Sequence, residues 1–200
     1  SCKFKSWIFL IILNWICNFH YSPLLLYPKF YLLFRSYNIF GYTFRPRTPE
    51  NIIEEIDHLV KDYNVKEIDF YDDNFNFDIK RAEKILDLII QRNYKIYIRF
   101  SNGLRADKIT KRLLQKMKKA GTDYIAYGIE SGDPKILRQI PKGESLSQIR
   151  RAVRLTHEAK IPVCGFFILG LIGDTKETMQ NTINFATSLP FDRIMLNIAT

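Results

Sequence analysis

The feature that most constrains the fold is a regular alternation of strand-like and helix-like segments over residues 48–200. Short runs rich in Ile, Val, Phe and Tyr are each followed by a longer amphipathic run with helical spacing. The expected helices cover residues 49–63, 78–92, 107–120, 145–159 and 176–189, and the expected strands cover residues 66–73, 95–100, 123–130, 162–170 and 193–199. This alternation predicts βα units around a parallel sheet, which right-handed crossovers would curl into a full or partial barrel.

Helix-capping residues support this reading. Thr48 and Asp133 are each followed by proline, a pair that predicts the N-cap and first residue of a helix. Gly121 suits the C-terminal stop of the helix that precedes it. Asp174 with Glu177 has the spacing of a capping box, which predicts a structural role for both side chains.

Composition narrows the classes of function. The chain is 46% hydrophobic and 26% charged, which is typical of a folded domain and argues against disorder. The net charge is +9, but the excess lies in helical runs where it would form solvated faces. We find no Arg-rich cluster interleaved with aromatics, which argues against a nucleic-acid partner. The three cysteines, Cys2, Cys17 and Cys164, fit neither a disulfide framework nor a zinc site and favour a reducing, cytoplasmic setting.

The first 35 residues do not share this order. An apolar run, WIFLIILNWIC, follows Lys3 and Lys5 but is shorter than the roughly 20 residues of a membrane span. It lacks an obvious small-residue cleavage site. We expect residues 1–35 to be a degenerate apolar segment and residues 36–200 to be the folded core. A membrane-tethered interaction protein is the alternative that this segment leaves open.

Polar residues stand where the expected strands end, which is the edge that carries function in βα barrels. Asp72 and Asp73 end the first of these strands and suit an amine, a hydroxyl or a metal, or simply a polar loop. Arg99, Asn102 and Arg105 follow in the next segment and suit a carboxylate or phosphate. The alternative there is structural, because the Asn102–Gly103 pair is a turn signal.

The next two strand ends differ in character. Glu130 closes the strand AYGIE and has no evident structural role, so we expect it to bind a ligand. Gly165 and Gly170 lie in GFFILG, where glycine lets a flat ligand approach the backbone. Cys164 precedes them, and we expect it to be a small core residue.

Taken in order, these segments resemble the radical S-adenosylmethionine (radical SAM) superfamily. The resemblance covers residues 36–200 and rests on NIFGYTFRPRTPENIIEEI, IDFYDDNF, RFSNGLRAD, AYGIESGD and GFFILGLIGDTKET. It implies a partial (β/α)6 barrel of parallel strands. It also implies reductive cleavage of S-adenosylmethionine to a radical that abstracts hydrogen from a small-molecule substrate. The variety it most resembles carries a cobalamin-binding domain upstream. We recognise no such domain in this sequence, so cobalamin is a weaker prediction than S-adenosylmethionine.

The resemblance also implies roles for particular residues. Asp72 and Asp73 match the region that meets the methionine amino group, and Glu130 matches the polar residue at the ribose or methionine end. The strand from Gly165 to Gly170 matches the one that packs against adenine. Lys142, in the turn QIPKG, matches a position that faces the carboxylate.

The family's defining motif is Cys-x3-Cys-x2-Cys, whose thiolates hold a [4Fe–4S] cluster. By register from Gly41, the motif falls on YPKFYLLF, where Tyr27, Tyr31 and Phe34 occupy the three ligand positions. Neutral Tyr and Phe do not replace thiolates, so we expect cluster binding and radical chemistry to be impaired. The alternative is a pseudoenzyme, a non-catalytic (β/α) scaffold that binds a nucleoside.

Overall fold

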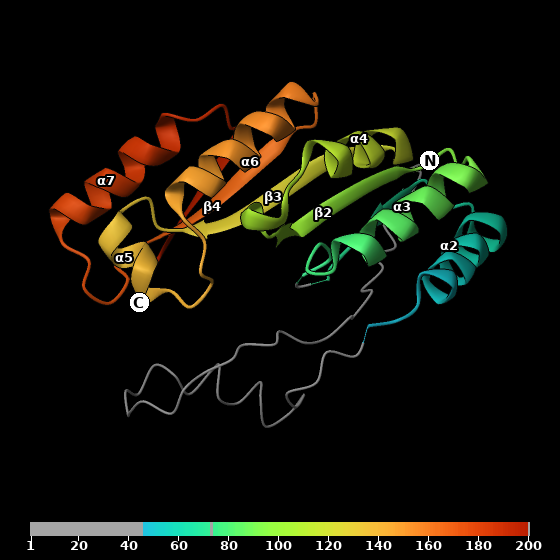
Figure 1. Cartoon of the computed structure of the whole chain (residues 1–200), viewed down its shortest axis with the longest axis horizontal. Helices are drawn as coiled ribbons and strands as arrows, with labels where there is room; N and C mark the ends of the chain where they lie inside the picture. The colour runs from blue at the N-terminus through green and yellow to red at the C-terminus, as the bar shows by residue number, and fades with distance from the viewer. Residues whose placement is uncertain (1–45, 73, 200) are drawn as a thin grey trace, which may run out of the picture.

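The computed structural model describes residues 46–72 and 74–199, and these residues form one parallel α/β layer structure (Figure 1). The strands are β1 (Glu67–Asp69), β2 (Tyr97–Leu104), β3 (Thr122–Glu130), β4 (Val163–Leu169) and β5 (Arg193–Ile198). The helices are α2 (Pro49–Tyr63), α3 (Ile79–Arg92), η2 (Ala106–Lys108), α4 (Lys111–Ala120), α5 (Pro134–Gln139), α6 (Leu146–Glu158) and α7 (Lys176–Thr187).

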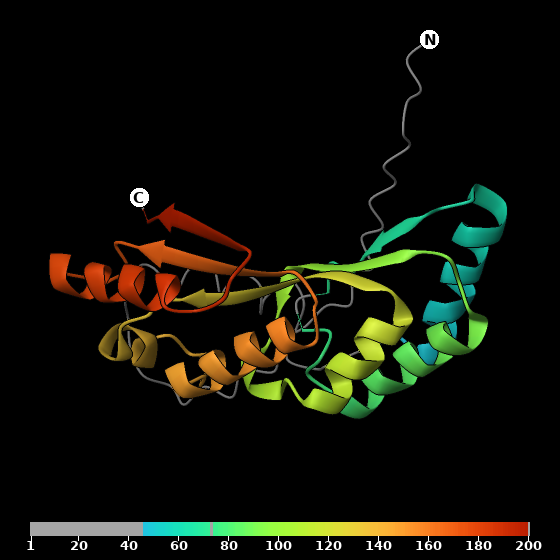
Figure 2. The ribbon, with the colours of Figure 1, turned by 90° about the horizontal axis from the view of Figure 1, so that it is seen from above.

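The five described strands form a single parallel sheet in the order β1-β2-β3-β4-β5, so the predicted α/β class is confirmed. The helices gather on one side of this sheet (Figure 2). A sequential order is what a partial barrel requires, and the curling itself stays a prediction. The structure describes five of the six strands that the resemblance implies, and the whole 1–35 segment lies outside the described residues. Within the described part of the chain, no helix is both long and apolar enough to cross a bilayer.

The predicted helix ends are largely confirmed. The Thr48 hydroxyl accepts from Asn51 N at 3.2 Å, and Gly121 closes α4 with a φ of +98°. The Asp133 carboxylate caps α5, accepting from the Lys135 and Ile136 amides at 2.8 and 3.2 Å. These contacts satisfy backbone donors that a helix start leaves without partners.

Two local predictions are wrong. The capping box of α7 is formed by Thr175 and Thr178, because the Asp174 carboxylate turns back to accept from the Gly170 and Leu171 amides at 2.9 Å. Glu177 therefore has no capping-box partner at Asp174. The Asn102–Gly103 pair is not a turn: β2 continues through it to its last residue, with a shift of register against β3. A φ of +104° at Gly103 absorbs this irregularity, as glycine does at many β-bulges.

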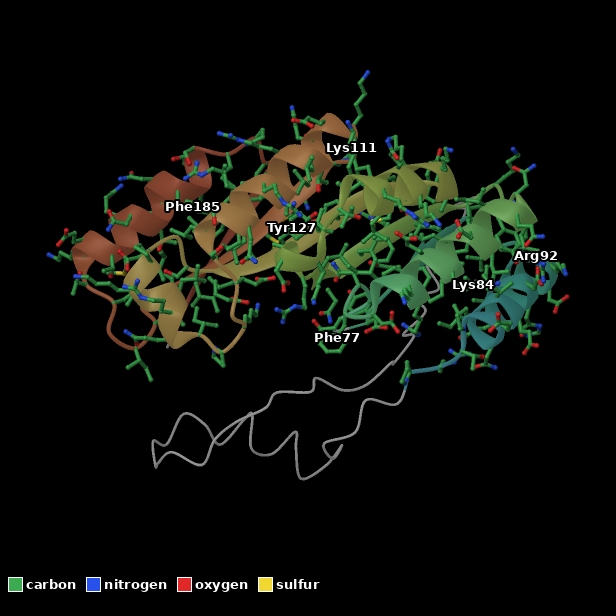
Figure 3. All side chains as sticks on the ribbon, viewed as in Figure 1. Phe77, Lys84, Arg92, Lys111, Tyr127 and Phe185 are labelled. Carbon is green, nitrogen blue, oxygen red and sulfur yellow. The ribbon has the colours of Figure 1, made fainter. Side chains whose placement is uncertain are left out.

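The core lies between the sheet and the helices. Phe70, Phe75 and Phe100 pack within this core with ring centroids 4.7–5.3 Å apart. Tyr127 is fully buried between β3 and α6, where its hydroxyl lies 2.7 Å from Thr156 Oγ1 (Figure 3). This continuous core fixes the strands, and the strands in turn fix the residues at their carboxyl ends.

Candidate functional site

Two described residues other than glycine and asparagine have a left-handed backbone. Lys160 follows α6, where helices commonly end in this way, and Glu130 lies at the carboxyl end of β3. Glu130 has a φ of +67°, in the left-handed region, where a residue with a Cβ costs about 1–2 kcal/mol. Its β4 partner is Phe167, and the pairing shifts register just before it. Strained residues persist where surrounding structure holds them, and they concentrate at functional sites. The strain therefore marks Glu130 as a candidate ligand-binding residue.

The Glu130 carboxylate forms an ion pair with the ammonium of Lys142, which follows α5. Lys142 Nζ also donates to the Gly128 carbonyl at 3.0 Å. The two charged side chains remain 20% and 34% exposed, so the pair is open to a ligand. A Cβ on Gly128 would lie 2.9 Å from Lys142 Nζ and 3.1 Å from Glu130 Oε1. Glycine at this position therefore makes room for the pair.

The loop after Glu130 is anchored to α7. Gly132 N donates to Thr182 Oγ1 at 3.1 Å, and the buried Ser131 hydroxyl lies 3.2 Å from the same oxygen. A Cβ on Gly132 would come within 2.5 Å of Phe185 Cβ, so the chain approaches the helix closely only because this residue is glycine. This packing fixes the direction in which the chain leaves β3.

The candidate carboxylate that follows β1 is held by its own loop. Asp72 is 5% exposed and accepts from Asn74 N at 2.9 Å. Its Oδ2 lies 4.0 Å from Nη1 of Arg81, a buried guanidinium at the start of α3. Asp73 lies outside the described residues. A role for either aspartate toward an amino group stays a prediction.

The structure adds residues that the sequence reading missed or placed differently. Asn76, two residues beyond the Asn74 turn, exchanges hydrogen bonds with the backbone of Arg105 at 3.0 and 2.8 Å. Arg105 in turn donates to the Lys142 carbonyl at 2.8 Å, which links the segments that follow β1, β2 and α5. Arg99, by contrast, pairs with Glu67 near the start of β2.

The two glycines predicted to face adenine have local structural roles of their own. A Cβ on Gly165 would meet the rings of Phe167 and Phe191 at 2.8–2.9 Å, on the helix-facing side of β4. Gly170 has a φ of +80° and starts the turn before α7. An adenine could meet the backbone of Gly165 only from the opposite face of the sheet, and contact of adenine with either glycine stays a prediction.

The described residues do not fit a [4Fe–4S] cluster. Cys164 is the one described cysteine; it is buried on β4, and burial raises the pKa of its thiol. No group of three or more His, Cys, Asp or Glu side chains in the described ranges is arranged to hold a metal ion. Tyr27, Tyr31 and Phe34 lie outside these ranges, so the structure does not test their ligand register.

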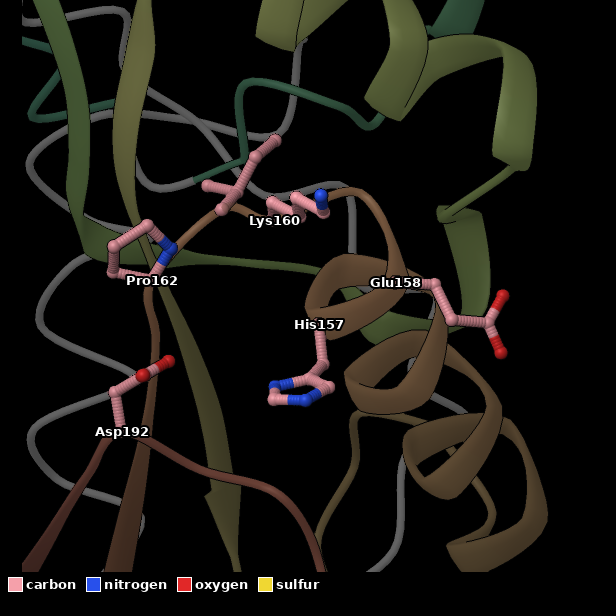
Figure 4. A pocket seen from close by; sticks show the side chains of 6 residues that line it. His157, Glu158, Lys160, Pro162 and Asp192 are labelled. Atoms are coloured by element: carbon pink, nitrogen blue, oxygen red, sulfur yellow. The ribbon is translucent and has the colours of Figure 1, made fainter.

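A surface depression of about 440 Å³ lies at the other edge of the sheet (Figure 4). Its lining comprises His157, Glu158, Lys160, Ile161, Pro162 and Asp192. Pro162 and Asp192 each directly precede a strand, so the depression lies at the amino ends of β4 and β5. Ligands in parallel α/β proteins bind at the carboxyl ends, which favours the Glu130 region as the functional site.

Comparison with curated proteins finds relatives that are longer than this chain. An uncharacterized methyltransferase of Pyrococcus horikoshii is 34% identical over 161 residues, covering 80% of this chain and 35% of the relative. An anaerobic magnesium-protoporphyrin IX monomethyl ester cyclase of Cereibacter sphaeroides is 28% identical over 186 residues, covering 88% and 30%. The chain thus spans about a third of the length of these two relatives.

Comparison with solved structures finds the same fold. The radical S-adenosylmethionine methyltransferase TsrM from Kitasatospora setae, solved with cobalamin and a [4Fe–4S] cluster, matches with a TM-score of 0.70 and 18% identity over 76% of this chain and 29% of TsrM. The cobalamin-dependent S-adenosylmethionine radical enzyme OxsB matches with a TM-score of 0.61 and 24% identity over 72% of this chain and 23% of OxsB. The family model of the radical SAM superfamily matches residues 15–186, most of the sequence. The chain belongs to the radical SAM superfamily.

Proposed function

We propose that the domain binds S-adenosylmethionine at the carboxyl edge of its sheet, with Glu130 and Lys142 as polar anchors. The observation that carries this proposal is the strained, left-handed Glu130 paired with Lys142 above a glycine that leaves them room. A strained carboxylate in a partly exposed ion pair is typical of a binding residue rather than of a packing residue.

The chemistry of the pair suits this ligand. A carboxylate accepts hydrogen bonds from ribose hydroxyls or an amino group, and an ammonium binds a carboxylate. S-adenosylmethionine carries all of these groups. We assign Asp72 and Asp73 to the methionine amino end, and the backbone between Gly165 and Gly170 to the adenine side.

We further propose that the complete protein is of the methyltransferase type. Support comes from the Pyrococcus horikoshii relative, which is named a methyltransferase, and from the fold shared with TsrM. TsrM and OxsB both bind cobalamin, so a cobalamin-binding domain and a small-molecule substrate are part of this proposal. A cytoplasmic location accords with the cysteine usage.

Our proposal for the [4Fe–4S] cluster differs from that for S-adenosylmethionine. When bound, a [4Fe–4S] cluster supplies the electron that cleaves S-adenosylmethionine in this family. The sequence contains cysteines only at positions 2, 17 and 164, and Tyr27, Tyr31 and Phe34 stand at the motif register. Iron–sulfur clusters need thiolate ligands. We therefore propose that this chain does not hold the cluster, and no radical step is assigned to it.

Calorimetric titration with S-adenosylmethionine tests the binding site. The unmodified chain is expected to bind, and Glu130→Gln is expected to weaken binding about tenfold because a charge-assisted hydrogen bond is lost. Glu158→Gln, an exposed change at the amino edge, serves as the matched control and is expected to leave the affinity unchanged. Equal affinities for all three proteins, or no binding by any of them, would remove the proposed site.

Anaerobic reconstitution with iron and sulfide tests the cluster. The unmodified chain is expected to stay colourless, whereas the triple variant Tyr27→Cys, Tyr31→Cys, Phe34→Cys is expected to show the broad absorbance of a [4Fe–4S] cluster. A cluster in the unmodified chain would contradict the register, with other cysteines serving as ligands. A triple variant that binds S-adenosylmethionine but stays colourless would favour the alternative, a non-catalytic nucleoside-binding scaffold.

A further inference from the structure

Two turns at the carboxyl edge of the sheet hold each other. The first is residues 105–107, after β2, and the second is residues 142–144, after α5. Arg105 Nη2 donates to the Lys142 carbonyl at 2.8 Å. In the other direction, Glu144 Oε1 accepts from Ala106 N at 2.7 Å and from Asp107 N at 3.4 Å. Hydrogen bonds to the first turn thus hold the second turn at Lys142 and at Glu144, on both sides of Gly143.

The guanidinium of Arg105 is itself fixed. Its Nε and Nη2 donate to the two carboxylate oxygens of Asp107 at 2.9 and 3.0 Å, the two-point geometry that orients a guanidinium most strongly. The backbone N and O of Arg105 are both bonded to the side chain of Asn76, which is fully buried. Arg105 is therefore a rigid link from the core to the Lys142 carbonyl.

The second turn depends on this link for its shape. Lys142 N donates to the Ile140 carbonyl at 2.8 Å, and Gly143 has a φ of +67°, so the chain reverses tightly around the Lys142 carbonyl. The side chain of Lys142 leaves the same residue to reach Glu130 and the Gly128 carbonyl. A shift of this turn would move the ammonium away from the pair.

The half-buried Glu144 carboxyl also holds the first turn in place. Burial raises its pKa, and the neighbouring Arg105 guanidinium offsets part of that rise. A hydrogen bond from a backbone amide to a carboxylate is stronger than a hydrogen bond between neutral groups. Arg105 therefore acts on the turn twice, by its own hydrogen bond to Lys142 and by its charge beside Glu144.

We infer that Arg105 is a positioning residue that holds Lys142 beside Glu130, rather than a residue that grips the ligand's anionic group itself. Its fork is directed to Asp107 and the Lys142 carbonyl, so its effect on a ligand passes through the Lys142 ammonium. This inference rests on the proposed S-adenosylmethionine site.

A double-mutant cycle measured by calorimetric titration with S-adenosylmethionine tests it. Arg105→Met and Lys142→Met keep apolar length and remove the donors, and each is expected to weaken binding about five- to tenfold. In the Lys142→Met background, Arg105→Met is expected to have no further effect. Arg112→Met, on the exposed face of α4, is the matched control and is expected to change affinity in neither background. An equal loss in both backgrounds, or no loss from Arg105→Met alone, would overturn the inference.

A ligand-free measurement separates this inference from the binding proposal. The side-chain NMR signal of Lys142, assigned by its absence in Lys142→Met, is expected to shift in Arg105→Met and to stay in place in Arg112→Met. If the unmodified chain binds no S-adenosylmethionine, the proposed function fails and this signal alone decides the positioning role. If Arg105→Met does not fold, Arg105→Lys keeps the charge without the two-point fork and is expected to produce the same shift; an unmoved signal would contradict the inference.

Discussion

Replacing Glu130 by glycine is expected to leave the domain more stable than replacing it by alanine, the reverse of the usual order. With a φ of +67°, alanine bears a cost of about 1–2 kcal/mol that glycine does not. Glycine loses about 0.5–1 kcal/mol more chain entropy than alanine on folding. Both variants lose the same ion pair with Lys142, so that contribution cancels. Taking the middle of each range, the difference is roughly 0.5–1 kcal/mol in favour of glycine.

Thermal and urea unfolding, followed by circular dichroism, would measure this difference. In a protein of this size 1 kcal/mol corresponds to about 2–4 °C in Tm, so Glu130→Gly is expected to melt about 1–4 °C above Glu130→Ala. Lys84, exposed on α3 (Figure 3), provides the control pair. There Lys84→Ala is expected to exceed Lys84→Gly by about 1 kcal/mol, the ordinary helical preference.

One result would refute the proposed backbone strain at Glu130. An alanine variant at position 130 that is as stable as the glycine variant would show that the backbone there is not strained. Strain could then no longer support a binding role for Glu130. Both variants are expected to lose affinity for S-adenosylmethionine, because both lack the Glu130 carboxylate, and to differ only in stability.

Two further predictions concern stability, one beside the candidate site and one at the amino end of the sheet. Gly132→Ala is expected to lower the free energy of unfolding by about 1–3 kcal/mol in urea titrations, because the new Cβ would meet Phe185 Cβ at 2.5 Å; an unchanged midpoint would contradict this close approach. The hydrogen bond from the Tyr94 hydroxyl holds the pKa of Asp57 below its usual value, so the stabilisation is present above about pH 4 and is lost as pH falls through the lowered pKa. The stability advantage of the unmodified chain over Tyr94→Phe should therefore shrink below about pH 4, and an advantage that grows there would refute this sign.

Much of the fold could be predicted because its signals are local. Thr48 and Gly121 end helices by contacts within a few residues, and amphipathic spacing selects the buried face. The two wrong details have different causes: the first is strand pairing at long range, and the second is a local hydrogen bond to amides three and four residues earlier that replaces the expected capping box. The Asn102–Gly103 pair remains in β2 because this strand pairs with β3 on both sides of it. The Asp174 carboxylate accepts hydrogen bonds within the turn before α7 and not at the start of the helix.

The candidate site was predictable only in part. Glu130 was predicted to bind a ligand from its place at a strand end, and Lys142 was predicted to do so from the family resemblance, but their direct contact was not predicted. That contact depends on the left-handed backbone at Glu130 and on the space beside Gly128. Neither feature can be predicted from the pattern of a single sequence. The clamp by Arg105 was missed because it joins residues 37 positions apart through a backbone carbonyl.

The sequential order of the described sheet has a consequence for how the chain assembles. Each of its strands finds its partner one βα unit away, so pairing in this sheet need not await a strand from the far end of the chain. Contacts of short sequence separation form early because little chain entropy is lost in closing them. As the chain leaves the ribosome, each new strand can dock on an edge that is already formed, and growth from β1 to β5 proceeds in the direction of synthesis.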